Sequence, residues 1–336
     1  MNQTGSRTVT PPAPAPAAPL SATRPSAAPG TPQTTGFDVH QHLWPSSLIE
    51  ALRARNRPPM LRDWTLHLTG EPPYQVKPGD HDVEARALSN DNALALVSLS
   101  CPLGLENLPS GEATALLDSW HAGAAALPTG FGAWASVQYR EPDLDGLAEL
   151  LANGFVGLQV PATWLATPHL LEELTPVLAV CERADRPVLV HPGAVPGPEA
   201  VLDSGPVREL PGWWPALVDY PAQQQAAWWS WHQTGRALLP RLRIGFVAGA
   251  GLAPLHHERL HARGGRFGTI DPGVFVETSS YGPQAVDALI RILGIDAVIR
   301  GSDRPYAEPV PFGFGNAADQ AINVTNPRRF LFGGTP

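Results

Sequence analysis

The sequence predicts an α/β fold, a closed (β/α)8 barrel of the TIM type, from three observations. From residue 37 onward, short apolar segments typical of buried strands alternate with segments of helical periodicity. Eight such strand segments fit within about 300 residues, which suits eight consecutive strand–helix units. No glycine-rich fingerprint follows the first of them, so the sequence favours the barrel over its alternative, a doubly wound open sheet.

The predicted strands are short runs dominated by Val, Leu, Ile, Phe and Ala, as expected for strands buried on both faces. In chain order they are Phe37–His42, Ala93–Leu99, Gly132–Val137, Phe155–Val160, Pro187–His191, Arg243–Val247, Val274–Glu277 and Ala297–Gly301. Most connections between them have helical spacing, among them Asp143–Ala152, His169–Arg183 and Pro283–Leu293. Strands that alternate with helices pair in parallel through right-handed crossovers, and this is the connectivity of a barrel.

Two connections are longer than ordinary barrel loops, one after the first strand and one after the fifth. Residues Pro45–Asn90 contain WTLHLTGEPPYQV, whose alternation predicts a small hairpin over the mouth of the barrel. Residues Pro192–Leu239 are rich in tryptophan. These tryptophans either pack a helix onto the barrel or bury a contact between subunits, and a homodimer is the expectation in the second case.

Residues 1–36 differ in composition from the rest of the chain. They consist mostly of Pro, Ala, Ser and Thr and have no apolar periodicity, so we expect a disordered tail ahead of a barrel domain at 37–336. Prolines interrupt the stretch where a signal peptide would need a continuous apolar segment.

The composition excludes several classes of partner. With 23 Lys+Arg against 31 Asp+Glu, the net charge is −8, which argues against sequence-independent binding of nucleic acid. No run approaches 18 uninterrupted apolar residues, so no membrane span is predicted. The two cysteines, Cys101 and Cys181, lie far apart in the chain and indicate free thiols in a reducing cytoplasm. A small molecule is therefore the expected substrate.

Histidines and an aspartate occur where predicted strands end. His40 and His42 are two residues apart on the first strand, so their imidazoles share one face. His191 ends the fifth strand, and Asp303 follows the eighth. In a barrel, all of these positions lie at the carboxyl ends of the strands, where active sites are found. Three imidazoles and one carboxylate are a suitable first shell for Zn²⁺ or a similar divalent ion.

The order of four motifs, DVHQHLW, VLVHPG, GSDRPY and NPRRFL, resembles the amidohydrolase superfamily. Within it, the chain is most similar to the amidohydrolase-related (amidohydrolase 2) branch, which includes aminocarboxymuconate-semialdehyde decarboxylase-like enzymes. The resemblance runs from about Phe37 to Leu331. It implies that four residues surround one divalent metal ion, with the aspartate also acting as the catalytic proton-transfer group. These residues are His40, His42, His191 and Asp303.

Two positions depart from the pattern of the superfamily. In FVAGAGLAP, Ala248 stands where the resemblance implies a histidine, and the nearby His256 and His257 are candidate substitutes, although with His261 they also fit the solvated face of a helix. Gln159 stands where binuclear members carry a carboxylated lysine, so a single ion is expected. Zinc is the first choice, with Mn²⁺, Fe²⁺ or Co²⁺ as alternatives for this nitrogen and oxygen set.

Three functions follow from these residues. The first is metal-dependent hydrolysis of a small amide, ester or lactone, with Asp303 accepting the proton of a metal-activated water. The second is metal-dependent non-oxidative decarboxylation of a small aromatic or unsaturated acid, in which Asp303 protonates carbon. The third is a barrel that has lost catalysis and only binds a ligand or partner. Arg62, Trp64 and Tyr306 are candidate substrate contacts.

Glu277 ends the seventh predicted strand, in VFVETSSYG. As a buried acid at that position, it either orients one of the histidines from behind or pairs with an arginine.

Overall fold

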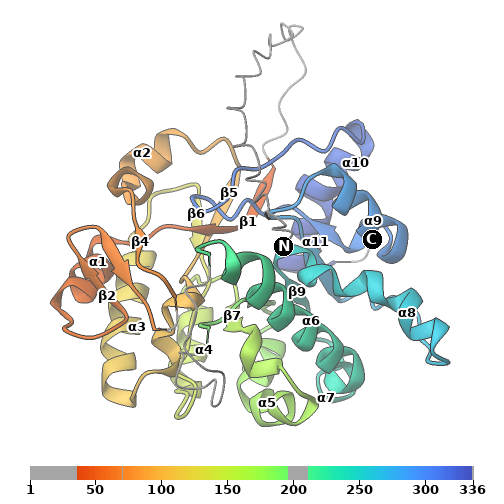
Figure 1. The fold of residues 1–336 in the computed structure, drawn as a ribbon, viewed down its shortest axis with the longest axis horizontal. Coiled ribbons are helices and arrows are strands. Elements are labelled where there is room, and N and C mark those ends of the chain that lie inside the picture. The colour runs from red at the N-terminus through yellow and green to blue at the C-terminus, as the bar shows by residue number, and fades with distance from the viewer. Residues whose placement is uncertain (1–35, 70, 196–210, 335–336) are drawn as a thin grey trace, which may run out of the picture. The chain divides into compact units, whose positions relative to one another are not determined.

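A ring of parallel strands forms the centre of the fold in the computed structural model, which describes residues 36–69, 71–195 and 211–334 (Figure 1). Each strand predicted from the sequence overlaps one strand of this ring. The ring strands are β1 (Phe37–His42), β5 (Leu94–Ser98), β6 (Phe131–Ala133), β7 (Leu158–Pro161), β8 (Val188–His191), β9 (Ile244–Phe246), β10 (Val274–Glu277) and β11 (Val298–Ile299). The tail predicted at residues 1–36 lies almost entirely outside the described residues.

The ring is closed by parallel contacts between two hydrogen-bonded sheets. One sheet has the order β1-β5-β6 and the other the order β11-β10-β9-β8-β7. Parallel bridges join Ala135 to Leu158 on one side and Gln41 to Arg304 on the other. Closure on the second side is reinforced by a hydrogen bond of 3.0 Å from the Val39 amide to the Arg300 carbonyl. The predicted (β/α)8 barrel is therefore confirmed, and an open doubly wound sheet is excluded.

The interior of the barrel is an apolar cluster that takes one buried residue from each strand or from within two residues of it. Two residues of α11 (Asn326–Phe332), Phe330 and Leu331, belong to the same cluster. The Arg243 guanidinium, just before β9, donates to the Phe330 carbonyl at 2.8 Å, so α11 covers the end of the barrel where strands begin. The strand-derived members of the cluster are Val39, Leu96, Trp134, Val156, Leu189, Val247, Phe275 and Ile299.

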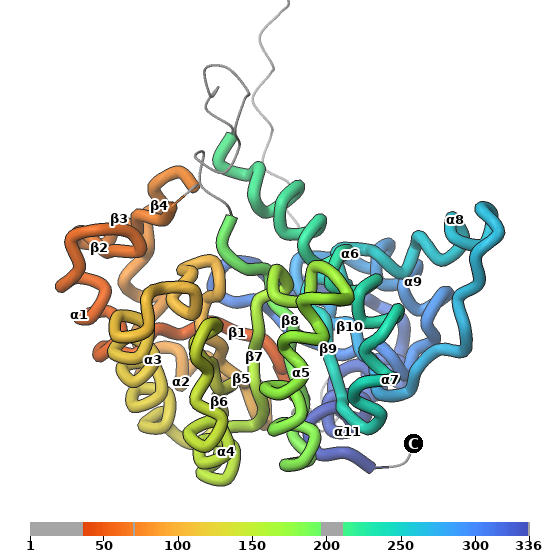
Figure 2. The backbone as a smooth tube through the Cα atoms, turned by 90° about the horizontal axis from the view of Figure 1, so that it is seen from below, coloured from red at the N-terminus to blue at the C-terminus, as the bar shows by residue number. Residues whose placement is uncertain are grey.

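Helices surround the strands, and their apolar faces pack onto the outer side of the ring (Figure 2). In α9, for example, Val286, Leu289 and Leu293 share one face and are buried. No helix among the described residues combines the length and apolar character that crossing a bilayer requires. The helices after the first excursion are α3 (Ser110–Ala125), α4 (Leu144–Ala152), α5 (Pro168–Arg183), α6 (Tyr220–Ser230), α7 (Arg236–Leu238), α8 (His257–Ala262), α9 (Pro283–Leu293), α10 (Asn316–Gln320) and α11.

The excursion after β1 contains more regular structure than the single predicted hairpin. Its strands pair antiparallel in the order β2-β3-β4, so a third strand extends the hairpin. Two helices flank this small sheet. In chain order the elements are α1 (Ser46–Ala54), β2 (Met60–Arg62), β3 (Thr65–His67), β4 (Tyr74–Gln75) and α2 (Val83–Leu88).

The tryptophans of the excursion after β8 serve mainly to pack its helix. Trp228 and Trp231 are each 1% exposed, and the Trp228 ring lies 5.3 Å from that of Phe246 in β9. Trp213, in contrast, is 54% exposed. The alternative in which the tryptophans pack a helix onto the barrel therefore holds for Trp228 and Trp231, and the predicted homodimer remains a prediction.

Candidate metal centre

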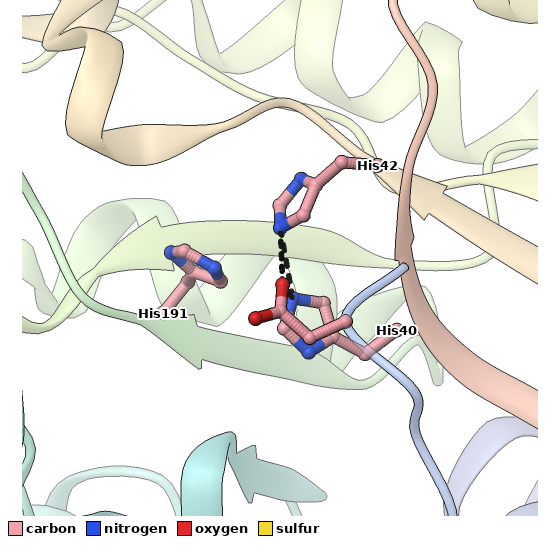
Figure 3. A group of neighbouring side chains, drawn as sticks. His40, His42 and His191 are labelled. Atoms are coloured by element: carbon pink, nitrogen blue, oxygen red, sulfur yellow. Dashed lines mark hydrogen bonds and ion pairs between the residues drawn. The ribbon is translucent and has the colours of Figure 1, made fainter. Parts of the chain in front are cut away.

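Three histidines and one aspartate meet at the carboxyl end of the barrel, and Figure 3 shows the three imidazoles turned toward a common point. Each of His40, His42, His191 and Asp303 offers one ligand atom, and these four atoms lie within 4.8 Å of one another. The Nε2 atom of His42 lies 3.1 Å from that of His40 and 3.1 Å from Oδ1 of Asp303. The histidines are buried, whereas the Asp303 side chain is 20% exposed.

His40 is positioned by a buried acid on the same strand, Asp38. The carboxylate of Asp38 accepts the amide of His40 at 3.3 Å and the amide of Ser302 at 3.0 Å. Its other oxygen accepts the Gln41 side chain at 2.7 Å. These bonds tie β1 to the segment after β11, so His40 and Asp303 are held in one local frame.

The hydrogen bonds on the far side of each imidazole determine which nitrogen faces the centre. Nδ1 of His40 lies 3.4 Å from Oε2 of Glu277, Nδ1 of His42 lies 3.1 Å from the Ser98 carbonyl, and Nδ1 of His191 lies 2.8 Å from the Pro192 carbonyl. All three partners are acceptors, which assigns the proton to Nδ1 and leaves the Nε2 lone pair free.

The donor set fits a divalent cation. With their protons on Nδ1, the Nε2 atoms of His40 and His42 turn lone pairs toward each other at 3.1 Å, an arrangement that is repulsive unless a positive charge lies between them. Asp303 contributes the anionic oxygen to the same point. Two or three imidazoles with one carboxylate suit Zn²⁺, Mn²⁺, Fe²⁺ or Co²⁺.

Three of the four pKa directions in the cluster, those of His42, His191 and Asp303, agree with this donor set. Burial lowers the pKa of His42, and burial with the two neighbouring rings lowers the pKa of His191 well below its usual value. For His40, burial acts in the same direction, but the carboxylates of Glu277, Asp303 and Asp38 together outweigh it and raise the pKa. Burial would raise the pKa of Asp303, yet its contacts with His42 and His40 lower it, so Asp303 stays ionised.

Glu277 orients His40 from behind, which is the first of the two roles predicted for it. Its Oε2 atom also accepts the Ala248 amide at 3.1 Å and the Ser279 hydroxyl at 2.7 Å, and its Oε1 atom accepts the Ser279 amide at 2.5 Å. A Cβ atom on Gly301 would lie 2.2 Å from Oε1, so only glycine leaves room for this carboxylate. A fully satisfied carboxylate behind a histidine is the usual support of a metal ligand.

Asp303 sits in a strained turn that turns its carboxylate toward the histidines. Its φ of 56° is in the left-handed region, which aspartate tolerates better than most residues. Its amide donates to the His40 carbonyl at 2.9 Å, and its carbonyl accepts the Tyr306 amide at 2.8 Å. These bonds hold the strained conformation in place.

Of the three predicted substrate contacts, the structure brings only Tyr306 to the centre. Its ring lies 5.3 Å from the ring of His42 and is 39% exposed. The guanidinium of Arg62 donates instead to the carbonyls of Arg53 and Arg55 at the end of α1. The ring of Trp64 lies 4.7 Å below the Arg53 guanidinium. Because β2 packs against α1, these two side chains are directed to that helix.

The expected substitutes for the missing histidine do not join the cluster. His257 is buried against Phe267, with 3.4 Å between ring centroids, and accepts a hydrogen bond of 3.3 Å from Trp228. The solvated face expected for His257 is therefore wrong, because the aromatic side chains of α6 cover it. His256 is exposed.

At Ala248 itself, the chain forms a left-handed turn. Ala248, Gly249, Ala250, Gly251 and Leu252 all have φ between 48° and 61°. Such a run is rare, because each non-glycine residue in this region costs about 1–2 kcal/mol. The turn contributes the Ala248 amide to Glu277, so the site receives a backbone donor from this strand end.

Several polar residues in the interior of the barrel were not predicted from the sequence. The Ser100 hydroxyl lies 3.2 Å from Nδ1 of His42 and accepts the Trp44 indole at 3.0 Å. Glu106 is fully buried, bonds the Ser136 hydroxyl at 3.3 Å, and has its pKa raised to about 7 by burial. Ser98 and Ser100 end an apolar strand in ALVSLS, the same signal that identified His191, whereas Glu106 carries no such signal.

No family model matches the chain, and no curated protein sequence matches it either. Solved structures do match. IDCase from Metarhizium anisopliae has a TM-score of 0.71 at 18% identity, covering 89% of this chain and 97% of that one. The 2,6-dihydroxybenzoate decarboxylase from Rhizobium has a TM-score of 0.62 at 17% identity, covering 88% and 98%.

A third similar structure is the 5-carboxyvanillate decarboxylase from Novosphingobium aromaticivorans, in complex with manganese and 4-hydroxy-3-methoxy-5-nitrobenzoic acid. Its TM-score is 0.63 at 15% identity, covering 89% of this chain and 96% of that one. These likenesses establish the fold, which is the barrel that the resemblance to the amidohydrolase-related branch implied.

Proposed function

We propose that the protein is a metal-dependent, non-oxidative decarboxylase of a small aromatic or unsaturated carboxylic acid, related to the amidohydrolase 2 branch. One observation carries the proposal: His40, His42, His191 and Asp303 converge at the catalytic end of a barrel whose fold is that of several aromatic-acid decarboxylases. These neighbours favour decarboxylation. The sequence alone ranked hydrolysis first.

The metal would be held by the three Nε2 atoms and the Asp303 carboxylate. When bound, a divalent ion supplies Lewis-acid attraction for the oxygen atoms of an acidic substrate. The manganese in a neighbouring structure supports Mn²⁺ beside Zn²⁺ as the first ions to test. Glu277 keeps the His40 ring in its ligating orientation through the Nδ1 contact of 3.4 Å.

Asp303 is the proposed proton-transfer group. In the reaction, the bond between the ring carbon and the carboxylate breaks, carbon dioxide leaves, and the electron pair left on carbon takes a proton. Asp303 is the one member of the cluster with a partly exposed side chain, so it can receive that proton from solvent and deliver it inside.

Two tyrosines give the mouth of the site an aromatic wall. Tyr306 and Tyr74 are 39% and 46% exposed, and their ring centroids are 6.1 Å apart. Burial of the hydroxyl raises the pKa of Tyr306, which therefore remains a phenol that can donate a hydrogen bond. A flat aromatic acid can stack beside these rings while its polar groups face the histidines.

The deciding experiment supplies the purified protein with Mn²⁺ or Zn²⁺ and measures carbon dioxide release from a panel of hydroxylated aromatic acids. Parallel assays use small amides, esters and lactones. We expect carbon dioxide release that a chelator abolishes and that Asp303→Asn lowers by at least about a thousandfold, with Arg62→Gln as a control that retains activity. Turnover of a lactone or ester without any carbon dioxide release would establish the hydrolase instead.

Absence of all turnover in protein that holds its metal would favour a binding barrel.

Cys101 and Cys181, both free and buried, support the expectation that the protein works in a reducing cytoplasm.

A further inference from the structure

A cavity of about 910 Å³ lies at the opposite end of the barrel from the histidines. Gly273 directly precedes β10, and the cavity reaches it, whereas Glu277 at the other end of β10 supports His40. Four strand residues at about 3.3 Å each separate these two ends by roughly 13 Å. The cavity is therefore a different site from the candidate metal centre. Its walls come from the α6–α7 region, the segment between α8 and β10, helix α11 and the residues before β9.

Five arginines line this cavity against a single acid, Asp271. Two of the five are neutralised by neighbours. Arg236 binds Asp271 through contacts of 2.6 and 3.1 Å, and Arg243 binds Asp185 at 2.5 Å. The protein as a whole carries a net charge of −8, so this cavity is locally basic in a chain that is acidic overall.

The other three arginines, Arg241, Arg266 and Arg329, have no carboxylate partner among the residues that the structure describes. Glu182 lies near Arg241, but it accepts the backbone amide at 2.7 Å and not the guanidinium. Arg329 donates to the carbonyl of Asp296. Guanidinium groups that face a cavity without a counter-charge attract anions strongly, because each offers a fork of donors.

The walls between the arginines are aromatic. Trp229, Trp231 and Phe267 line the cavity, and the guanidinium of Arg236 lies 5.4 Å above the Trp231 ring. A volume of about 910 Å³ exceeds what a bare phosphate needs and suits an organic molecule with a flat body.

Buried polar atoms in these walls lack partners. Nε1 of Trp231, a residue that is 1% exposed, Nε2 of His232 and Nε of Arg329 are all buried and form no hydrogen bond. Leaving such atoms unpaired costs about 1–3 kcal/mol each, but because they are buried they are not open to a ligand in the cavity. Burial lowers the pKa of His232 to about 4, so this ring is a neutral partner at physiological pH.

We propose that the cavity lined by Arg241, Arg266, Arg329 and Trp231 binds a small organic anion with an aromatic body, at a site separate from the metal centre. The anionic group pairs with the exposed guanidinium groups of Arg241 and Arg266, and the flat body packs against the partly exposed rings of Trp229 and Phe267. Because the cavity contacts the beginnings of β9 and β10, occupancy stabilises the barrel whether or not the metal centre is active.

The test uses naphthalene-1-sulfonate as the probe, with inorganic phosphate as the comparison anion, and calorimetric titration of the metal-loaded full chain. We expect naphthalene-1-sulfonate to bind more tightly than phosphate, and Arg241→Gln and Arg266→Gln each to weaken it about tenfold. Both side chains are exposed, so their replacement leaves the fold intact, which thermal unfolding checks. Arg140→Gln and Arg183→Gln remove exposed arginines outside the cavity and should change nothing.

His191→Ala separates this site from the metal centre, because binding to the cavity persists in that variant. The proposal is overturned if the probe does not bind wild type below about 1 mM, an affinity of roughly −4 kcal/mol, or if the cavity variants bind as tightly as wild type. Loss of binding in His191→Ala with retention in Arg266→Gln would assign the probe to the metal centre. Phosphate binding as tightly as the sulfonate would overturn the aromatic part of the proposal.

Discussion

The ends of β1 and β8 and the end of β9 contribute to the same site in opposite ways. The first two strands end in side chains, His40, His42 and His191, which meet at one point. The third ends in a left-handed turn at Ala248, which contributes a backbone amide to Glu277. The difference teaches that a strand end can support a metal centre from behind, by fixing the carboxylate that orients a ligand, and need not add a ligand of its own.

The left-handed turn is kept in place by its neighbours. A Cβ atom on Gly251 would lie 2.4 Å from the Pro221 carbonyl, so glycine is required where the turn meets α6. The Gln225 side chain donates to the Gly251 carbonyl at 2.8 Å. Strain of this kind persists where packing over-determines the backbone, and here it lies beside the site.

The largest predicted difference is in metal affinity. It should appear when one side chain is removed from the end of β1 and one from the turn after β9. We expect His42→Ala to weaken binding of Mn²⁺ or Zn²⁺ by more than about 100-fold, since it deletes a proposed ligand and not an outer partner. Ala248→Gly should leave metal affinity within about threefold, because the amide to Glu277 remains. Competition with a chelating dye measures both constants.

His169→Gln is the control for the first variant, because His169 is 77% exposed on α5. Equal losses of metal affinity in His42→Ala and Ala248→Gly would remove the distinction between the two strand ends.

A smaller effect on metal affinity is expected at Glu277, which contacts both His40 and the Ala248 amide. Glu277→Gln keeps the size of the side chain but removes the charge facing Nδ1 of His40, and we expect metal affinity to fall about 10- to 100-fold. Ser279→Ala removes one hydrogen-bond donor to the same carboxylate and should cost less than tenfold. The measurement is again metal affinity, with circular dichroism to verify folding. An unchanged affinity in Glu277→Gln would mean that packing alone orients His40.

Much of this site could be predicted from the sequence because its residues end strands. The segment RPVLVHPG indicates a buried strand and also shows that the strand ends in His191. Because the strands of a closed barrel end at the same face, the convergence of His191 with His40 and His42 follows. Glu277 was identified for the same reason, although only the contact of 3.4 Å with His40 decided between its two predicted roles.

The orientation of the excursions could not be predicted, because it depends on tertiary packing. Arg62 ends β2 and Trp64 lies in the turn before β3, but the direction of their side chains is set by α1, which the sequence did not position. In the same way, His257 is covered by aromatic residues of α6 that lie about thirty positions earlier in the chain. The left-handed turn at Ala248 also depends on α6, through contacts that leave no local pattern beyond the glycines.

The smallest predicted effect concerns the backbone strain at Ala248. Replacing alanine by glycine should raise the free energy of unfolding at this position, whereas the same replacement in an ordinary right-handed helix should lower it. Ala248→Gly relieves a left-handed alanine, worth about 1–2 kcal/mol, against an entropic loss of about 0.5–1 kcal/mol. We therefore expect the free energy of unfolding to rise by up to about 1.5 kcal/mol. Ala179→Gly in the right-handed helix α5 should lower it by about 1 kcal/mol. Urea denaturation of both variants, without metal, measures the pair. An equal decrease in the free energy of unfolding of both variants would show that Ala248 is unstrained. The left-handed turn that supplies the amide to Glu277 would then carry no strain at this residue.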